Sequence, residues 1–243
     1  RDVTRHLIQG IPLGLQFSVL AIGIIVMQSV IVQFDTLGGE MVSNAAQNGF
    51  GAANKLNNLL MTPLNGLGAA MTSFTAQNLG AGDHARIRKG TVQALIIVWT
   101  MCLISIAAGL LLSRGGGYLY IFLSPDKVTA ETVRYGNTYL YVDLSLYLFL
   151  GFIFVVRNCV QGIGKPQFVL GAGAAELVAR VSVCLLLPPL IAGGAVSSDA
   201  PPAAVYALCF ADPFAWMAAD AVLLVPFLRN IMKMDYRYLK GTV

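Results

Sequence analysis

Six long runs of apolar residues, separated by short links that hold most of the charges, constrain this chain more than any other feature. A helix that crosses a bilayer needs about 20 mostly apolar residues, and each run is long enough. Charged residues make up 12% of the chain, whereas a soluble domain usually carries about a quarter. The pattern predicts an all-α membrane protein, a bundle of six transmembrane helices. The expected helices cover residues 7–34, 42–79, 91–112, 130–156, 168–192 and 204–228.

The second run and the turn after it, residues 41–90, organise the rest of the chain. At about 1.5 Å per residue a helix over residues 42–79 is longer than the bilayer is thick, so it must tilt, bend or project beyond the membrane. Pro63 is the expected place of a bend, and Pro12 is a candidate for a kink in the first helix. Gly80 and Gly82 are expected to form a tight turn into the third helix.

Three other segments interrupt the apolar pattern. Residues 113–127 combine glycines with aromatic residues, and we expect a surface connector whose aromatic part lies in the membrane interface. Residues 157–166 are expected to form a second glycine turn directly after the fourth helix. Pro188 and Pro189 are expected to break the fifth helix near its end.

The distribution of Lys and Arg predicts the orientation, because cytoplasmic links carry an excess of both. One set of alternate links, with both ends of the chain, carries eleven of the sixteen bases, the other set carries three, and two lie within the runs. The eleven are Arg1, Arg5, Arg86, Arg88, Lys89, Arg157, Lys165, Arg229, Lys233, Arg237 and Lys240; the three are Arg114, Lys127 and Arg134. The split predicts that both ends are cytoplasmic in a multi-pass protein of the plasma (inner) membrane.

No residue pattern points to an enzyme, a metal site or a bound cofactor. The four cysteines are widely spaced within apolar segments, and the chain has only two histidines, which argues against a zinc site or a disulfide framework. The glycine turn after residue 79 lacks the preceding strand that a phosphate-binding loop needs. Neither a catalytic residue nor a nucleic-acid partner is expected.

Ionisable side chains inside the runs are the strongest functional signal, because such groups are costly in a bilayer and usually face a cavity or a partner. Asp143 lies in the fourth run among Tyr139, Tyr141 and Tyr147. One interpretation is a proton or Na⁺ site built on a buried carboxylate. The other is a carboxylate in the wet outer part of the helix, hydrogen-bonded to tyrosine or serine.

Two further groups leave alternatives open. Glu176 and Arg180 are four residues apart on one helix face, so we expect the pair to neutralise itself, with a structural or gating role favoured over substrate contact. Lys55 lies in a polar patch with neighbouring asparagines, where it either lines a cavity or extends to the outer surface.

Two acids in the sixth run differ in expected depth. Asp212 is expected near the outer surface and hydrated, whereas Asp220 lies deeper and is a candidate ion or substrate site. Gln16 and Gln47 are candidates for lining a cavity that accepts diverse substrates, or for hydrogen bonds between helices.

Several short motifs together resemble the multidrug and toxin extrusion (MATE) family of cation-coupled efflux transporters. The block from Pro63 to Gly82 is the most specific part of the resemblance, which covers essentially the whole chain. The matching motifs are Gly10-x-Pro12-x-Gly14-Leu15-Gln16, Asn44-Ala45-Ala46, Pro63-x-x-Gly66-Leu67-Gly68-Ala69-Ala70, Gln77-Asn78-Leu79-Gly80-Ala81-Gly82, Gln161-Gly162-x-Gly164-x-Pro166 and Asp212-Pro213-x-Ala215-Trp216.

The resemblance implies a twelve-helix protein of two six-helix lobes that exchanges Na⁺ or H⁺ for organic, often cationic, compounds through a central cleft. This chain resembles the C-terminal lobe, residues 1–243, and its start at Arg1 suggests a piece of a longer polypeptide. Some subfamilies place an acidic cation site on the first and fourth helices of this lobe. Asp143 matches the fourth-helix acid, but residues 7–34 contain no carboxylate, so the other lobe is the alternative place for the ion site.

The expected partners are therefore the lipid bilayer, a small organic substrate and an N-terminal six-helix lobe of the same polypeptide. The expected mechanism is alternating access by rocking of two lobes, with bending near Pro12 and Pro63. A flippase of lipids or lipid-linked substrates from the same superfamily is the alternative function, and a membrane scaffold that transports nothing is a more distant one.

Overall fold

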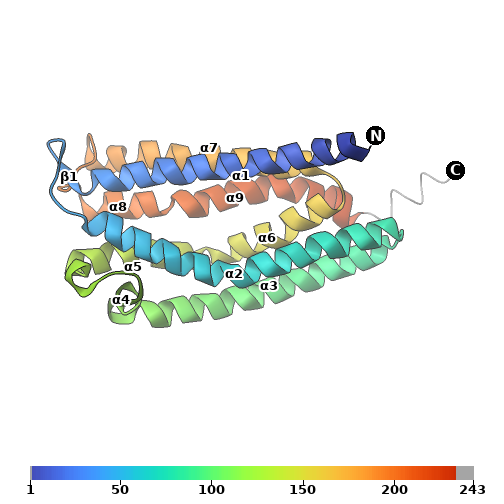
Figure 1. The fold of residues 1–243 in the computed structure, drawn as a ribbon, viewed down its shortest axis with the longest axis horizontal. Helices are drawn as coiled ribbons and strands as arrows, with labels where there is room; N and C mark the ends of the chain where they lie inside the picture. Colours follow the sequence, from blue (N-terminus) through green and yellow to red (C-terminus); the bar gives the residue numbers. More distant parts are fainter. Residues whose placement is uncertain (1, 234–243) are drawn as a thin grey trace.

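The computed structural model describes residues 2–233; within the first helix it describes no side chain for residues 2–9, 12, 13 and 17. In this range six helical rods lie side by side in an elongated bundle, and two of the rods are broken (Figure 1). The rods are α1 (Asp2–Gln33), α2 (Ala45–Gly80), α3 (His84–Ser113), α5 (Ala130–Ser145) with α6 (Tyr147–Gly162), α7 (Pro166–Ala192), and α8 (Pro202–Cys209) with α9 (Ala211–Pro226). The all-α membrane bundle expected from the apolar runs is confirmed.

The rods form two layers. One layer contains α1, α7 and the α8–α9 rod, and the other contains α2, α3 and the α5–α6 rod (Figure 1). The layers meet mainly where α6 packs against α9 and α5 packs against α8. Because α1 packs chiefly on α7, whereas α2 packs on α3, α5 and α6, α1 and α2 leave space between them.

Short elements connect the rods at one end of the bundle. Strands β1 (Thr36–Leu37) and β2 (Glu40–Met41) form a two-residue antiparallel hairpin after α1. Between α3 and α5 the chain forms η1 (Arg114–Gly116), α4 (Leu119–Phe122) and η2 (Pro125–Lys127). In this connector Tyr118 is buried in the bundle and Tyr120 is exposed. The position of its aromatic part in the membrane interface stays a prediction.

The hairpin leads into α2 through a buried acid. The Asp35 side chain accepts hydrogen bonds from the backbone N–H groups of Ala46 (3.0 Å) and Gln47 (2.9 Å) in the first turn of α2. The first N–H groups of a helix have no partner within the helix, so the carboxylate satisfies two of them and complements the helix dipole. A link that is acidic in sequence is therefore a helix cap in the structure.

Four described helices are long and apolar enough to cross a membrane, and a fifth span results if the bent α5–α6 pair is counted as one. They are α1 from Gly14 onward, α3 with η1, α7, and the α8–α9 rod with the π-helical segment η3 (Phe227–Met232). Despite its 36 residues, α2 is not among them. Its first half carries several asparagines and a lysine, which lower its hydropathy and face the bundle interior in part.

Three expectations about helix ends are corrected. The fourth run is not one straight helix, because it breaks at Leu146 with a bend of 57° between α5 and α6. The sixth run breaks at Phe210. Arg157 belongs to α6 and not to a turn, because the helix continues to Gly162.

The two consecutive prolines of the fifth run do not break it. The helix α7 continues through Pro188 and Pro189 to Ala192, and Gly193 ends it with φ at 73°. A proline φ near −65° is compatible with a helix, and the lost hydrogen bonds are confined to the carbonyls of Cys184 and Leu185, one turn earlier. Helices of membrane proteins tolerate such prolines where neighbouring groups satisfy the freed carbonyls.

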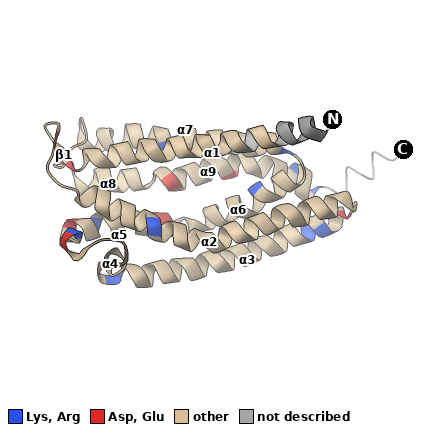
Figure 2. Cartoon of the chain, in the orientation of Figure 1, with Lys and Arg blue, Asp and Glu red and all other residues tan. Residues whose placement is uncertain are grey.

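Charged residues gather at the two ends of the bundle, with a few inside it (Figure 2). Basic residues lie where α2 meets α3, around Gly82, whose φ of 75° makes the turn between these helices. Gly80 is the last residue of α2 and has no positive φ, so Gly82 is the glycine that the turn requires. Asp83 then caps α3 by accepting a hydrogen bond of 2.9 Å from the Arg86 N–H group.

Candidate functional site: a polar cavity between the two layers

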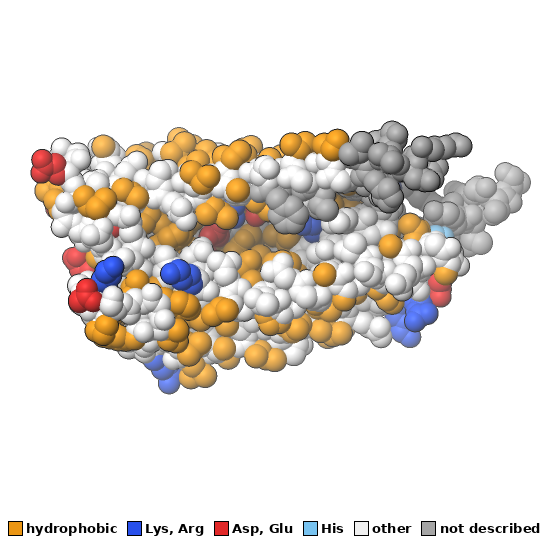
Figure 3. Space-filling view, viewed as in Figure 1, with side chains coloured by type: hydrophobic (Ala, Val, Ile, Leu, Met, Phe, Trp, Pro, Cys, Tyr) orange, Lys and Arg blue, Asp and Glu red, His pale blue; other side chains and the backbone are white. Residues whose placement is uncertain are grey.

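A cavity of about 420 Å³ lies between the two layers of helices, with walls from α1, α2, α5, α6, α7 and α9. Figure 3 shows this face of the molecule hollowed at its centre, with acidic and basic side chains visible in the hollow. Apolar side chains line much of the rest of the wall. The polar and charged side chains of the wall are Gln16, Asn54, Asn57, Asn58, Asn65, Tyr139, Arg157, Asn158, Gln161, Glu176, Arg180 and Asp212.

A chain of ion pairs occupies one side of the cavity. The Arg157 Nη2 atom lies 2.7 Å from Glu176 Oε2, and Arg180 Nη2 lies 3.4 Å from Glu176 Oε1. Arg180 also donates from Nε to Asp212 Oδ1 at 2.8 Å. We call Arg157, Glu176, Arg180 and Asp212 the paired cluster. Two positive and two negative charges balance in it, which offsets the large cost of taking each charge out of water.

The paired cluster links three helices. Arg157 comes from α6, Glu176 and Arg180 from α7, and Asp212 from α9. The expected pair within α7 is present, but its distance of 3.4 Å is longer than the contacts that each partner makes to another helix. Asp212 was expected near the surface and hydrated; that is wrong, since it is 8% exposed and bound to Arg180.

Tyr139 connects the paired cluster to the other side of the cavity. Its hydroxyl donates to Asp212 Oδ2 at 2.9 Å and accepts a hydrogen bond of 3.3 Å from Asn54 Nδ2 on α2. Asp143 follows one turn later on α5, and an α-helix places residues four apart on the same face. The Tyr139 side chain therefore lies beside both the paired cluster and Asp143.

Asp143 has no exposed surface and no cationic hydrogen-bond partner among residues 2–233. Its Oδ2 atom accepts a hydrogen bond of 2.8 Å from Asn57 Nδ2. The Oδ1 atoms of both Asp143 and Asn57 are buried and have no partner in the described part of the chain. Of the two interpretations left open by the sequence, the placement favours the buried carboxylate over the wet outer helix. Two unsatisfied oxygen atoms on adjacent side chains are an unusual and costly arrangement.

The remaining candidates separate into those at the cavity and those away from it. Gln16 lines the cavity, is buried, and has an Oε1 atom without a partner in the described range. Gln47 lies in the first turn of α2 outside the cavity wall. Lys55 is exposed, with its Nζ atom 5.9 Å from the centre of the Phe122 ring, so it extends to the surface and does not line the cavity.

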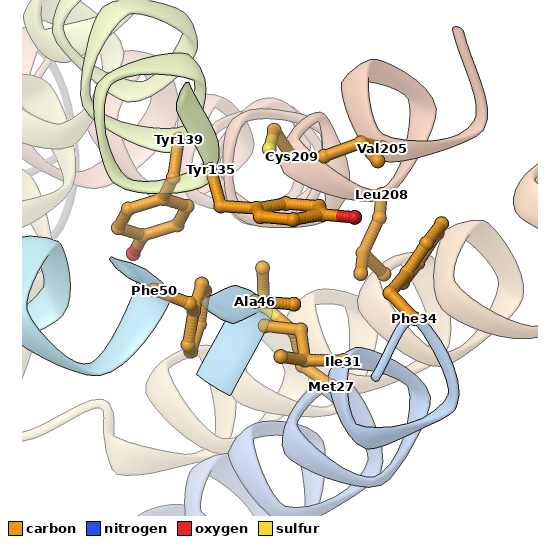
Figure 4. A pocket seen from close by; sticks show the side chains of 10 residues that line it. All are labelled: Met27, Ile31, Phe34, Ala46, Phe50, Tyr135, Tyr139, Val205, Leu208 and Cys209. Carbon is orange, nitrogen blue, oxygen red and sulfur yellow. The ribbon is translucent and has the colours of Figure 1, made fainter. Parts of the chain in front are cut away.

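An apolar layer closes the cavity toward the hairpin end. A void of about 20 Å³ lies beyond the cavity and shares Met27, Phe50 and Tyr139 with its wall (Figure 4). The Phe50 and Tyr139 rings are in edge contact, with centroids 4.6 Å apart. Further out, Phe34 and Tyr135 pack at 6.4 Å. These rings separate the cavity from the surface at this end.

Of the two candidate hinge prolines, Pro63 has a described side chain and Pro12 does not. Pro63 lies inside α2 and is exposed, and Figure 1 shows α2 changing direction part-way along its length. A proline inside a helix removes one hydrogen bond and commonly kinks it. The backbone of α1 is continuous through Pro12, whose side chain lies outside the described part.

Sequence reasoning missed three members of the site. Arg157 follows the last apolar residue of its run and was therefore assigned to a turn, although its helix continues. Asn57 and Tyr139 were noted only as neighbours of other candidates. Among residues 2–233 no group of three or more His, Cys, Asp or Glu side chains gathers as a metal site would require.

The chain is similar to known proteins over most of its length. The MatE family model matches residues 13–186. Over 173 residues the chain is 30% identical to a probable multidrug resistance protein, YpnP, of Bacillus subtilis (strain 168), which covers 66% of this chain and 33% of that protein. The chain thus spans about a third of the length of the curated relative it matches. No solved structure matches the chain.

Proposed function

Because the chain belongs to the MatE family of membrane transporters, we propose that it forms one six-helix lobe of a secondary active exporter. In this proposal, organic compounds, often cationic, leave the cell in exchange for Na⁺ or H⁺. The similarity to a protein described as a probable multidrug resistance protein supports export of diverse compounds. The proposal also includes a second six-helix lobe, the C-terminal position of this lobe and a location in the cell membrane.

The observation that carries the proposal is the pair of unpartnered oxygen atoms on Asp143 and Asn57 beside the cavity. A Na⁺ ion takes oxygen ligands, and a proton on the carboxylate supplies the missing donor, so either coupling ion relieves the cost of the buried charge. Asn57 lines the cavity, which gives the ion a route from the cavity to Asp143.

Exchange follows if the ion and an organic cation use the same negative charge in turn. The charges of the paired cluster cancel, so Asp143 supplies the uncompensated negative charge near the cavity wall. The wall combines amide side chains with apolar and aromatic ones. Such a wall accepts apolar bodies of different shape while a single charge selects cations.

Alternating access requires a part of the bundle that bends. The cavity is closed toward the hairpin end by Met27, Phe50 and Tyr139, and α2, α5 and α6 on that side contain Pro63 and the 57° bend at Leu146. We propose that bending at these breaks opens the apolar layer when the lobes rock.

The coupling proposal is tested with the complete protein in vesicles that carry a Na⁺ or H⁺ gradient. Efflux of a fluorescent organic cation is measured with and without the gradient. Asp143→Asn is expected to abolish the acceleration by the gradient. Asp126→Asn, which removes an exposed acid from the connector, is the matched control and is expected to keep it. Unchanged ion dependence in Asp143→Asn would overturn the role of this residue.

The bending proposal has its own test. Pro63→Ala restores a backbone N–H to α2. It is expected to lower the efflux rate several-fold and to leave the substrate affinity unchanged, because a straighter helix resists opening. Efflux rate and substrate affinity are measured in the same vesicles. A Pro63→Ala variant that transports at the normal rate counts against bending at this residue.

A further inference from the structure

A second hollow lies on the outer side of the bundle, between α3, α6 and α9. It is a shallow, open groove of about 600 Å³ and shares no residue with the central cavity. Its wall is apolar except for one acid. The wall residues used below are Trp99, Leu148, Phe149, Phe152, Met217 and Asp220. Trp99, Phe149 and Met217 are each about two fifths exposed (39%, 39% and 40%), so this surface faces lipid in a membrane-embedded bundle.

The walls of this hollow are held in place by specific contacts. The indole Nε1 atom of Trp99 donates a hydrogen bond of 3.1 Å to the Leu148 carbonyl, directly after the bend at Leu146. The Phe152 ring packs edge-on against Phe227, with centroids 5.5 Å apart. A preorganised wall loses little freedom when a ligand binds.

Trp99 lies near the middle of α3. In membrane proteins tryptophan is usually found at the two interfaces, where its N–H group reaches water or lipid headgroups. Here the Leu148 carbonyl takes that N–H group, which leaves the aromatic face free at the depth of the lipid chains.

Asp220 is the ionisable residue in this wall. Its Oδ1 atom is buried and has no hydrogen-bond partner among residues 2–233. On the inner side, the charged groups that act on it are Arg157 and Glu176, which already form an ion pair with each other. A carboxyl group within a membrane span is costly unless something compensates it, so it usually marks a functional site.

We propose that this hollow binds amphiphilic organic cations that reach it from the bilayer. The ammonium group of such a molecule neutralises Asp220, and its apolar body packs against the aromatic walls. The face of Trp99 adds a cation–π contact. This inference rests on the proposed function in that the exported compounds include organic cations, but it concerns a separate site where they gather before or beside the central cavity.

The test measures quenching of Trp99 in the complete protein, reconstituted in uncharged phosphatidylcholine vesicles. The probe is a dodecyl quaternary ammonium that carries a nitroxide, and its partner is a neutral nitroxide of the same chain length. Trp99 emission is the difference between the parent protein and Trp99→Phe. The cationic probe is expected to reach half-quenching at about a tenfold lower concentration than the neutral probe, a difference of about 1.4 kcal/mol.

Two variants assign that preference to Asp220. Asp220→Asn is expected to remove the preference for the cationic probe, and Asp220→Glu is expected to retain it. Asp126→Asn removes an exposed acid elsewhere and is expected to change nothing. Equal quenching of Trp99 by both probes in the parent, or a preference that survives in Asp220→Asn, overturns the site.

The other tryptophan separates this inference from the proposed function. Trp216 lines the central cavity, and the difference between the parent and Trp216→Phe reports on it. Cation-selective quenching of Trp99 without quenching of Trp216 supports the outer site and contradicts binding in the central cavity. The reverse pattern overturns the outer site and leaves the proposed function standing, and the absence of any cation preference at both tryptophans overturns both.

Discussion

Two kinds of charged region lie inside this bundle, and they differ in how their charge is balanced. In the paired cluster every charge has an opposite charge within 3.4 Å, and the contacts connect α6, α7 and α9. Asp143 and Asp220 each have an oxygen atom without a partner in the described part of the chain. The first kind of region joins helices and needs no ligand. The second kind leaves a carboxyl oxygen for a proton or a ligand from outside the chain to satisfy.

The difference predicts that the two regions respond in opposite ways to mutation. Loss of one member of the paired cluster leaves its partner as a buried, unbalanced charge. Loss of a single carboxyl removes an unbalanced charge. The first change is expected to weaken the fold, and the second is expected to spare the fold and change binding.

The largest effect is expected for Arg180→Met. It leaves Asp212 without its cation and Glu176 with Arg157 alone, and removal of one partner from a buried pair typically costs about 3–5 kcal/mol. Unfolding is followed in detergent with a thiol-reactive dye, because all four cysteines are buried in the folded bundle. The control is the double variant Arg180→Met with Asp212→Leu, which is expected to recover at least half of the loss. A single variant as stable as the parent would show that the cluster does not hold the helices.

A smaller effect is expected for Tyr139→Phe, which removes the hydroxyl between the two regions. Asp212 keeps Arg180 but loses one hydrogen bond, and a hydrogen bond to a charged group is worth about 1.5–3 kcal/mol. The same thiol assay measures the loss of stability, and gradient-driven efflux measures the coupling. If the hydroxyl connects the paired cluster to Asp143, both the stability and the gradient-driven efflux change. A change in stability alone would show that the hydroxyl does not connect them.

The smallest effect on stability is expected for Asp143→Asn. The amide keeps nearly the same shape and removes a costly buried charge, so the free energy of unfolding should fall by no more than about 1 kcal/mol. The same variant is expected to lose the ion dependence of efflux. A destabilisation as large as that of Arg180→Met would place Asp143 among the structural residues and would contradict the comparison.

The apolar pattern of the sequence was sufficient for the fold class and for the approximate place of each rod. Helix ends were predicted well where a cap or a glycine marks them, as at Gly82. They were missed at Leu146, where the chain bends by 57° without a proline nearby, and at Phe210, where the signal was overlooked: Pro213 has no N–H group to donate to the carbonyl of Cys209. The prolines at 188 and 189 gave the opposite error, because a helix of a membrane protein can continue through proline when neighbouring groups satisfy the carbonyls one turn earlier.

The residues of the candidate site also divide into those that the sequence predicted and those that only the structure brought together. Asp143 was found from sequence because a carboxylate in an apolar run is conspicuous, and Glu176 and Arg180 because they lie four residues apart. The contacts of Arg157 with Glu176 and of Arg180 with Asp212 join residues on different helices. No spacing along the chain encodes such contacts.

The sequence by itself therefore determined that this is a helical membrane protein of the MatE family and which acids lie within its apolar runs. Hydropathy and short motifs are local properties of the sequence, so they can be recognised without knowledge of the packing. Only the tertiary structure decided which of those acids are balanced, because that depends on which helices meet. It paired Asp212 with Arg180, left Asp143 beside the cavity with no cationic hydrogen-bond partner among the described residues, and placed Asp220 in the wall of a hollow on the outer side of the bundle.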